Sequence, residues 1–579
     1  MSVAFLALAA GCGKPAGHAL PEPPRVASCE PGKVGGQLVL TTEGSPKTFN
    51  PVFAVDAGSE SVTRLLFSPL VHFDMATQEP SPGLAESWSV EADQKTWTFK
   101  LRKGLRWSDG QPLTADDVLF TWNDILYNSE FSRFTPDTLL SVAGKPFTVS
   151  KVDDLTIRLV TPEVVAPLLQ FVSGAPIVPK HILDRELRAK NFLNAYSVNV
   201  NPRSIIGSGP YRILDSRAGK VILLERNPEY YAVDKNGVRL PYLDQIQMNV
   251  APDAGMSAFF FFQNQNDVCE SLRPDVRPQF EAAFAKRTGR FVDLGAGVEG
   301  NFFWFNQNTN TDATGKSLVN PAKLKWFRDK KFRQAVSCAI NRTRIAQEVY
   351  GGHGQAVDSF VSADNSKWNN PNIARFGYDP ARARALLAEI GIQDRNGDGL
   401  LEDGDGHAIE ISIISNSDNA ARSKMAVMIQ DDLKQLGFKA EYHPVTFQMI
   451  VEKMTTKFDY ECAIIGLGGG GADPATQMNI IRSSEPMHQW FPQQKSPSTD
   501  WEARLDSLMD TQMSTLDFVT RKKCYDEVQT IWAEQQPMIP VAAPLVSAAI
   551  RSDLANVRPS VASQHHITWN IEELYLKGK

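Results

Sequence analysis

The sequence predicts an α/β fold that is divided into more than one lobe. Its 579 residues are too many for a single hydrophobic core. From about residue 300 onward, segments with the two-residue hydrophobic period of strands alternate with segments that have the 3.6-residue period of helices. This alternation is typical of a lobe with a partly parallel sheet, whereas the first half is richer in strand signals. We therefore expect two or three lobes.

The strand pattern is clearest at residues 96–101. There Trp97, Phe99 and Leu101 alternate with polar residues, as in a strand with one buried face. Similar signals predict strands at 37–41, 96–101, 156–160, 221–225, 246–250, 302–306, 409–414, 439–444 and 460–466.

The first helix is marked by its cap. Thr114 lies three residues before Asp117, the spacing of a capping box, and the following apolar residues fall on one side of a helix. The same period predicts helices at 115–127, 330–350, 380–390, 420–436, 449–455 and 518–535.

The composition excludes one broad class of function. Hydrophobic residues make up 42% and charged residues 22% of the chain, values that are ordinary for a soluble globular protein. The net charge is -6 and no long Lys/Arg stripe is present, so nucleic-acid binding is not expected.

The N-terminus resembles a processed lipoprotein signal. Residues 3–10 form a short apolar run that ends in small residues directly before Cys12, and this run is too short to cross a membrane. We expect residues 1–12 to be the signal, with Cys12 as the lipidation site. Residues 13–35 are rich in Pro, Gly and Ala and predict a flexible tether. A secreted protein with a frayed N-terminus remains the alternative.

Several segments together resemble one known family. Residues 84–122 read LAESWSVEADQKTWTFKLRKGLRWSDGQPLTADDVLFTW. Further matches are SPKTFNP at 45–51, GSGPY at 207–211, NPEYY at 227–231 and FRQAVSCAINR at 332–342, followed by YGG at 350–352. They resemble, in order, the family 5 extracellular solute-binding proteins, which include the oligopeptide and dipeptide receptors of ABC importers. The resemblance covers roughly residues 36–560.

This resemblance implies a two-lobed periplasmic-binding-protein fold, class II type, cluster C, with an extra subdomain inserted in lobe I. Two segments that cross between the lobes would lie near Leu294 and Gln535, and the lobes would close on a ligand by a hinge motion. The implied division is 36–62, 204–290 and 536–579 for lobe I, 63–203 for the inserted subdomain, and 291–535 for lobe II.

The glycine-rich loop that starts at Gly466 is the main ligand-binding candidate. It follows a predicted strand, and glycine allows a close approach of the backbone to a ligand. In peptide receptors of the family, a Trp and an Asp here hold the ligand, and the Asp pairs with the α-ammonium group. These positions correspond to Leu467 and Gly470, so both side chains are missing. The loop's predicted ligand-binding residues are Gly466, Leu467, Gly468, Gly470 and Asp473, where Asp473 either replaces the missing carboxylate or caps the following turn.

Further candidates come from the same resemblance. In lobe I these are Asp56, Gly58 and Ser59. In lobe II, alternation along 301–306 predicts that either the Phe303/Phe305 set or the Trp304/Asn306 set faces the crevice and that the other set is core. The predicted ligand-binding residues of lobe II are Trp304, Asn306, Trp368 and Trp490.

A calcium-binding loop is the only metal site that the sequence indicates. Asp394, Asn396 and Asp398 take the first, third and fifth positions of an EF-hand-like loop, and Asp405 stands where such a loop has its bidentate Glu. An ordinary polar turn is the competing interpretation. No other cofactor is expected.

The sequence shows no GxSxG, HExxH or supported SxxK motif, so catalysis is not expected. After Cys12, five cysteines remain without a CxxC pair; a disulfide that involves Cys269 is left open.

We expect a monomeric receptor, lipid-anchored in the periplasm or at the cell surface, that passes a peptide to an ABC permease and its ATPase. The alternatives are an oligosaccharide or other solute as ligand, a ligand sensor or envelope chaperone, and, remotely, a secreted hydrolase.

Overall fold

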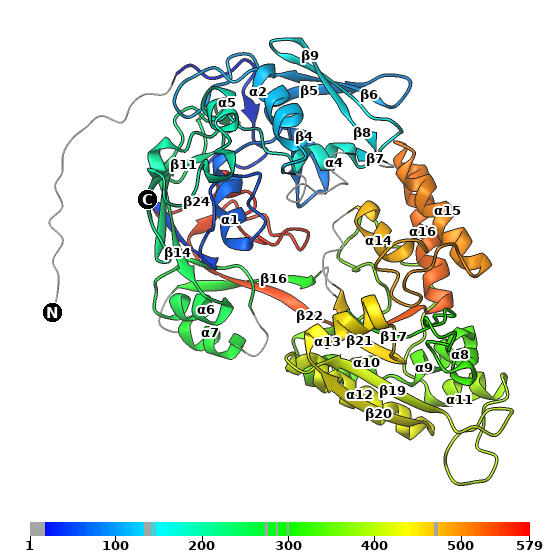
Figure 1. Cartoon of the computed structure of the whole chain (residues 1–579). Helices are drawn as coiled ribbons and strands as arrows, with labels where there is room; N and C mark the ends of the chain where they lie inside the picture. The colour runs from blue at the N-terminus through cyan, green and yellow to red at the C-terminus, as the bar shows by residue number, and fades with distance from the viewer. Residues whose placement is uncertain are drawn as a thin grey trace.

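The computed structural model describes residues 18–131, 141–142, 145–272, 276–284, 288–297, 300–467 and 473–578. Figure 1 shows two bodies joined by long strands, with the small sheet of a further subdomain at the top. Each body has its own hydrophobic core and its own sheet.

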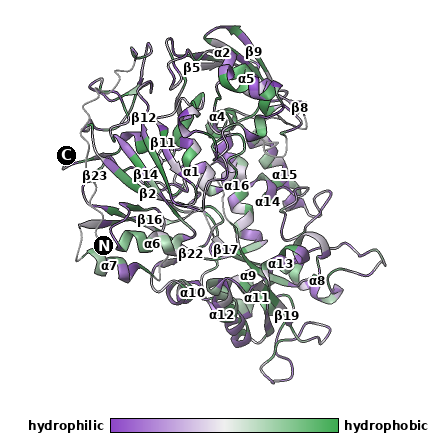
Figure 2. Cartoon of the chain, turned by 60° about the vertical axis from the view of Figure 1, so that its left-hand side comes forward, coloured by the Kyte–Doolittle hydropathy of each residue, from purple (hydrophilic) through white to green (hydrophobic). Residues whose placement is uncertain are grey.

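Lobe I is built on a four-stranded sheet. Its order is β11-β12-β14-β2, and only the β14–β2 pair is parallel. Inward-facing residues such as Leu38, Leu40 and Ile246 are buried, and Figure 2 shows hydrophobic and hydrophilic residues mixed along these strands. The bounds are β2 (Gln37–Glu43), β11 (Tyr211–Arg217), β12 (Val221–Arg226) and β14 (Gln245–Ala251), with helices α1 (Ala57–Leu66), α6 (Ala254–Phe262) and α7 (Arg277–Phe284).

The GSGPY segment has a packing reason for its glycines. The segment passes directly beside the C-terminal end of α1, where the N–H of Gly209 donates to the carbonyl oxygen of Leu66 at 2.8 Å. A Cβ atom on Gly207 would lie 2.0 Å from that same oxygen, and one on Gly209 would lie 2.4 Å from the oxygen of Leu65. Only glycine permits this approach.

The inserted subdomain contains an antiparallel sheet in the order β5-β6-β10-β9. Thr114 and Asp117 form the predicted capping box. The helix predicted at 115–127 changes hydrogen-bond pattern halfway, since α2 (Ala115–Leu119) continues as a π-helix at Phe120–Leu126. The other elements are β3 (Val71–Asp74), β4 (Glu79–Pro82), β5 (Ala85–Val90), β6 (Thr96–Leu101), β9 (Thr148–Asp153), β10 (Thr156–Val160), α4 (Leu168–Ser173) and α5 (Lys180–Arg188).

Lobe II holds the expected partly parallel sheet. β19 lies parallel to both β20 and β21, while β17 is antiparallel to β21 and β22. Its strands are β17 (Gly300–Phe305), β18 (Gly354–Ala356), β19 (Glu410–Asn416), β20 (Lys439–Val445) and β21 (Cys462–Leu467), and its longer helices are α8 (Pro321–Arg328), α9 (Lys330–Ala339), α10 (Arg342–Val349), α11 (Pro380–Ala388), α12 (Ala420–Leu436), α13 (Phe447–Glu452), α15 (Asp500–Met513) and α16 (Phe518–Gln535).

One strand belongs to both lobes. β22 (Met538–Arg551) pairs with β17 through residues 538–542 and with β16 (Gly289–Ala296) through residues 545–551. The short β15 (Val268–Cys269) also pairs with its second half. In Figure 1, β22 runs from the left-hand body to the right-hand one beside β16. The structure thus places paired strands at the two crossings.

The helix predicted at 330–350 is wrong as a single element. α9 ends at Ala339, and Asn341 caps α10 by accepting from the N–H of Arg344. The break lets buried Arg342 donate to the carbonyl oxygens of Ser337 and Pro540. Because a buried guanidinium needs such partners, the tertiary structure overrides a continuous helical period.

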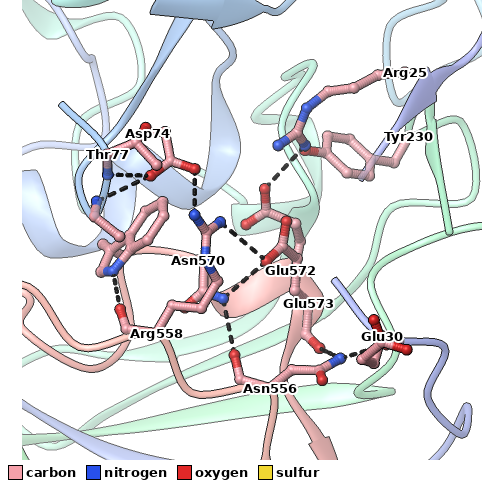
Figure 3. Close-up of polar contacts among 12 residues, drawn as sticks. Arg25, Glu30, Asp74, Thr77, Tyr230, Asn556, Arg558, Asn570, Glu572 and Glu573 are labelled. Carbon is pink, nitrogen blue, oxygen red and sulfur yellow. Dashed lines mark hydrogen bonds and ion pairs between the residues drawn. The ribbon is translucent and has the colours of Figure 1, made fainter. Parts of the chain in front are cut away.

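The tether prediction for 13–35 is also wrong for its described part. β1 (Arg25–Val26) pairs with β13 (Ala232–Val233), and Arg25 donates to Glu572 at 3.1 Å. Asn556 of the C-terminal segment donates to the carbonyl oxygen of Glu30 at 2.7 Å. Figure 3 shows this cluster, in which Arg558 also reaches Asp74 of the inserted subdomain. Residues 18–35 are therefore part of lobe I.

Within the described part of the chain, no helix is long and apolar enough to span a bilayer. The five described cysteines are all buried and free, so the disulfide that was left open for Cys269 is not formed. Cys338 and Cys462 are fully buried and pack in the lobe II core.

Glu502, in the first turn of α15, is a buried carboxylate that organises lobe II. It accepts hydrogen bonds from the Nε1 of Trp490 at 3.0 Å, from Ser498 Oγ at 2.9 Å and from Thr499 Oγ1 at 2.8 Å. Burial favours its neutral form, but these bonds and one from His488 outweigh it and lower the pKa of Glu502 from 4.5 to about 2. Such a lowering corresponds to about 3 kcal/mol of stability at neutral pH.

Glu502→Gln should lower the free energy of unfolding by about 3 kcal/mol at pH 7, because the amide keeps the shape but loses the charge that these donors stabilise. The folded-state pKa is depressed, so the wild-type advantage is present above pH 4.5 and disappears as the pH falls toward 2. Urea unfolding across this range measures the difference. Asp500→Asn, an exposed change in the same turn, is the control; equal destabilisation by both changes would contradict the assignment.

Candidate functional site

The described residues enclose a cavity of about 680 Å³ where lobe I meets the crossing strands. Its walls come from the C-terminal ends of β2 and β15, from α1, from Pro544 and Val546 of β22, and from the loop at 561–568. Gly297, between β16 and β17, completes the wall. The cavity is within the usual size range for small-ligand sites.

The loop at 561–568 is held in place by Glu270 and Arg64. Glu270 accepts hydrogen bonds from the N–H groups of Ile567 at 2.7 Å and Thr568 at 3.2 Å, and from the Thr568 hydroxyl. Arg64 of α1 donates to the carbonyl oxygen and to the hydroxyl of Thr568, both at 3.1 Å. Burial lowers the pKa of Arg64. This wall is therefore fixed by charge-assisted hydrogen bonds.

Glu60 and His565 form a second contact between α1 and the 561–568 loop. Glu60 of α1 accepts from His565 Nε2 at 2.9 Å and from Gln564 at 2.7 Å. Burial, together with the nearby positive charge of Arg64, lowers the pKa of His565. At neutral pH the imidazole is thus uncharged and donates its Nε2 proton. Behind Arg64 and His565 lies a further cavity of about 380 Å³.

The predicted ligand-binding residues of lobe I stabilise the start of α1 and do not line the cavity. Asp56 caps α1 and accepts from the N–H of Ser59 at 3.0 Å and from its hydroxyl at 2.8 Å. Ser59 is fully buried, and a Cβ atom on Gly58 would lie 2.7 Å from the carbonyl oxygen of Gly44. Their neighbours Ala57 and Ser61 line the cavity instead.

The expectation that one set of residues along 301–306 faces the crevice is wrong. Phe303 and Phe305 lie in one core cluster and Trp304 in another, on the opposite face of the sheet, because helices and loops cover both faces. Trp304 donates to Tyr460 at 3.3 Å. Asn306 is fully buried and donates to two backbone carbonyl oxygens.

The two remaining tryptophans are also interior. Trp368 is 2% exposed and packs edge-on against Phe518. Trp490 is fully buried and bonded to Glu502. In this structure, the predicted aromatic platform of lobe II is therefore hydrophobic core.

The glycine-rich loop is described only at its ends. Gly468 and Gly470 lie outside the described residues. A Cβ atom on Gly466 would lie 2.1 Å from the Arg422 guanidinium, which occupies this space. Leu467 is half-buried against the lobe II core. Asp473 caps the turn that follows, as one of the two interpretations predicted, and its carboxylate forms a bidentate pair with Arg521 at 2.6 and 2.9 Å.

The acidic loop brings Asp394, Asp398 and Glu402 together, with one oxygen of each within 4.8 Å of the others. The placement of Asp405 as the final ligand is wrong, since Asp405 groups with Asp403 and His407. Asn396 accepts from the N–H of Asp398 at 2.8 Å, and Gly399 has a positive φ of 87°. The carboxylate set suits a hard cation that prefers oxygen ligands.

Sequence reasoning missed Glu43, Arg64, Glu270 and the loop at 561–568. The sequence offered one usable signal, the SQHH segment at 563–566, whose two histidines both line the cavity. Glu43 and Glu270 gave no signal, because a carboxylate at the end of a strand resembles any solvated residue.

The family model "Bacterial extracellular solute-binding proteins, family 5 Middle" matches residues 79–489. A protein of Deinococcus radiodurans named "Probable ABC transporter-binding protein" is 28% identical over 570 residues, which cover 94% of each chain.

Two solved structures share the fold. The oligopeptide-binding protein AppA of Bacillus subtilis, in complex with a nonapeptide, is 25% identical with a TM-score of 0.62, covering 94% of this chain and 99% of that one. The periplasmic binding protein MelB of Agrobacterium fabrum, in complex with stachyose, is 21% identical with a TM-score of 0.67, covering 96% and 88%. These likenesses confirm the two-lobed fold, and the chain belongs to the bacterial extracellular solute-binding proteins of family 5.

Proposed function

We propose that this protein is the extracytoplasmic receptor of an ABC importer and that it captures a peptide between its lobes for delivery to a permease. The observation that carries the proposal is the cavity at the lobe junction. Its walls include the crossing strand β22, so rotation of the lobes would change its shape. A monomer that is lipidated at Cys12 and works in the periplasm or at the cell surface completes the proposal.

The relatives support the ligand class. The relative from Bacillus subtilis holds a nonapeptide, and the protein from Deinococcus radiodurans is named as a transporter-binding protein. The cavity combines an apolar strand with hydrogen-bonding groups from the 561–568 loop, which suits a peptide backbone. Catalysis is not part of the proposal, because the family is defined by solute binding.

An oligosaccharide is the second candidate. Gly470 replaces the carboxylate with which peptide receptors of this family pair the α-ammonium, and the structural neighbour from Agrobacterium fabrum holds stachyose. The polar wall also suits sugar hydroxyls, because neutral His565 gives its Nε2 proton to Glu60 and keeps Nδ1 as an acceptor, and the Gln564 carbonyl oxygen can accept as well.

Native mass spectrometry of the chain without residues 1–12 should show a co-purifying peptide, because a closed receptor retains its ligand during purification. Fragmentation of the released molecule identifies it. The same preparation after unfolding and refolding is the ligand-free control. A bound saccharide would contradict the peptide assignment and leave the receptor assignment in place.

Lipidation at Cys12 has its own test. Intact-mass analysis of the protein from membranes of its source bacterium should show an N-terminal cysteine with diacylglycerol, and Cys12→Ser should move the protein to the soluble fraction. A matched Cys29→Ser variant should stay in the membrane fraction. Membrane association of the Cys12 variant equal to that of wild type would exclude this anchor.

We also propose that calcium binds through Asp394, Asp398 and Glu402. Calcium at ten times its dissociation constant should raise the free energy of unfolding by about 1.4 kcal/mol. Calorimetric melting curves with calcium and with a chelator measure the difference. Glu402→Gln should abolish it and Asp405→Asn should retain it; a response lost only with the Asp405 change would support the original loop register instead.

A further inference from the structure

The peptide proposal leaves one physical question, which is how the ligand's ammonium group is balanced. An ammonium ion that leaves water without a partner costs several kcal/mol. The two carboxylates that the sequence suggested are both engaged. Asp473 is paired with Arg521, and Asp56 is tied to Ser59 at the start of α1.

Two carboxylates line the cavity, Glu43 and Glu270, and a third, Glu60, lies directly behind its wall; Glu270 and Glu60 are both engaged in hydrogen bonds. Glu270 accepts three hydrogen bonds from Ile567 and Thr568. Glu60, which stands directly behind the wall, accepts from Gln564 and His565. Breaking either set would release the 561–568 loop, so neither carboxylate is available to a ligand without a structural penalty.

Glu43 differs from both. It is the last residue of β2, lines the cavity and is exposed, and among the described residues its carboxylate has no hydrogen bond or ion pair. Its backbone is fixed by pairing with Ala251 of β14, so the side chain starts from a rigid strand end. A rigid base positions a charge more accurately than a loop does.

The electrostatic field of the cavity favours a cation. Among the described residues that line the cavity, the carboxylates Glu43 and Glu270 face one cationic side chain, Arg64, while His565 is neutral at pH 7. Cys269 also lines the cavity. Burial first, and then the negative charges of Glu270 and Glu43, raise the pKa of its thiol to about 12. The two carboxylates therefore act on the same space.

We propose that Glu43 pairs with the α-ammonium group of a bound peptide and so takes over, from lobe I, the role of the carboxylate that is missing at Gly470 in lobe II. This inference rests on the proposed peptide function. It assigns the N-terminal end of the ligand to the part of the cavity between β2 and α1. It also makes Glu43 a determinant of specificity for free over blocked N-termini.

The test uses an equimolar library of short synthetic peptides and the same library after N-acetylation. The chain without residues 1–12, unfolded and refolded to remove any ligand, is incubated with both, and retained peptides are counted by mass spectrometry. Wild type should retain free over acetylated peptides. Glu43→Gln should reduce this ratio about 10-fold or more, because a hydrogen bond to a charged group is lost.

Two variants separate charge from structure. Glu43→Asp keeps the charge and should keep most of the preference, while Glu441→Gln, an exposed change on β20 of lobe II, should keep all of it. The melting temperature of Glu43→Gln should equal that of wild type, because among the described residues the carboxylate has no hydrogen bond or ion pair to lose.

The outcomes are distinct. An unchanged ratio in Glu43→Gln, or equal retention of free and acetylated peptides by wild type, overturns the role of Glu43 while the peptide function stands. Retention of no peptide from either library overturns the peptide function and this inference together.

Discussion

The architecture depends on one strand that two sheets share. Met538, Ile539 and Val541 of β22 are buried in the cores of lobe II, whereas Ala548 and Ile550 are buried in the core of lobe I. Both halves of the strand keep their backbone hydrogen bonds to neighbours, so neither lobe can detach without unpairing an inner strand. Between the two halves, Pro544 and Val546 line the cavity, so a rotation of one lobe relative to the other would act directly on the cavity wall.

The sequence predicted the regular elements well where local period and tertiary burial agree. β6, β10, α12 and α16 have the predicted bounds because their apolar residues repeat with one period throughout. The prediction of one continuous helix at 330–350 was wrong because buried Arg342 needs backbone carbonyl groups as partners. Hydrophobic periodicity carries no information about this requirement. The prediction of a flexible tether was wrong for residues 18–35. Composition there indicates flexibility, whereas Arg25 forms a hydrogen bond with Glu572, which is distant in the sequence.

The binding residues were harder to predict than the fold. Trp304, Trp368 and Trp490 have the chemistry of a ligand platform, but a sheet covered on both faces turns the same residues into core. Whether a carboxylate is available to bind a ligand or is already bonded within the protein depends on the hydrogen-bond donors that surround it. Glu502 has several donors and Glu43 has none among the described residues, although both are single glutamates in the sequence. Only the three-dimensional structure distinguishes them.

For a receptor lipidated at Cys12, as proposed, the pairing of β1 with β13 would also set the distance between the protein and the membrane. A 23-residue tether, 13–35, could extend to about 80 Å, but with residues 18–35 bound to lobe I only 13–17 are left, which span at most about 18 Å. A receptor anchored at Cys12 would then stand close to the bilayer with lobe I as its base. Lobe II would then move above lobe I. The anchored receptor would reach the proposed permease by lateral diffusion along the membrane, in two dimensions and with a restricted orientation.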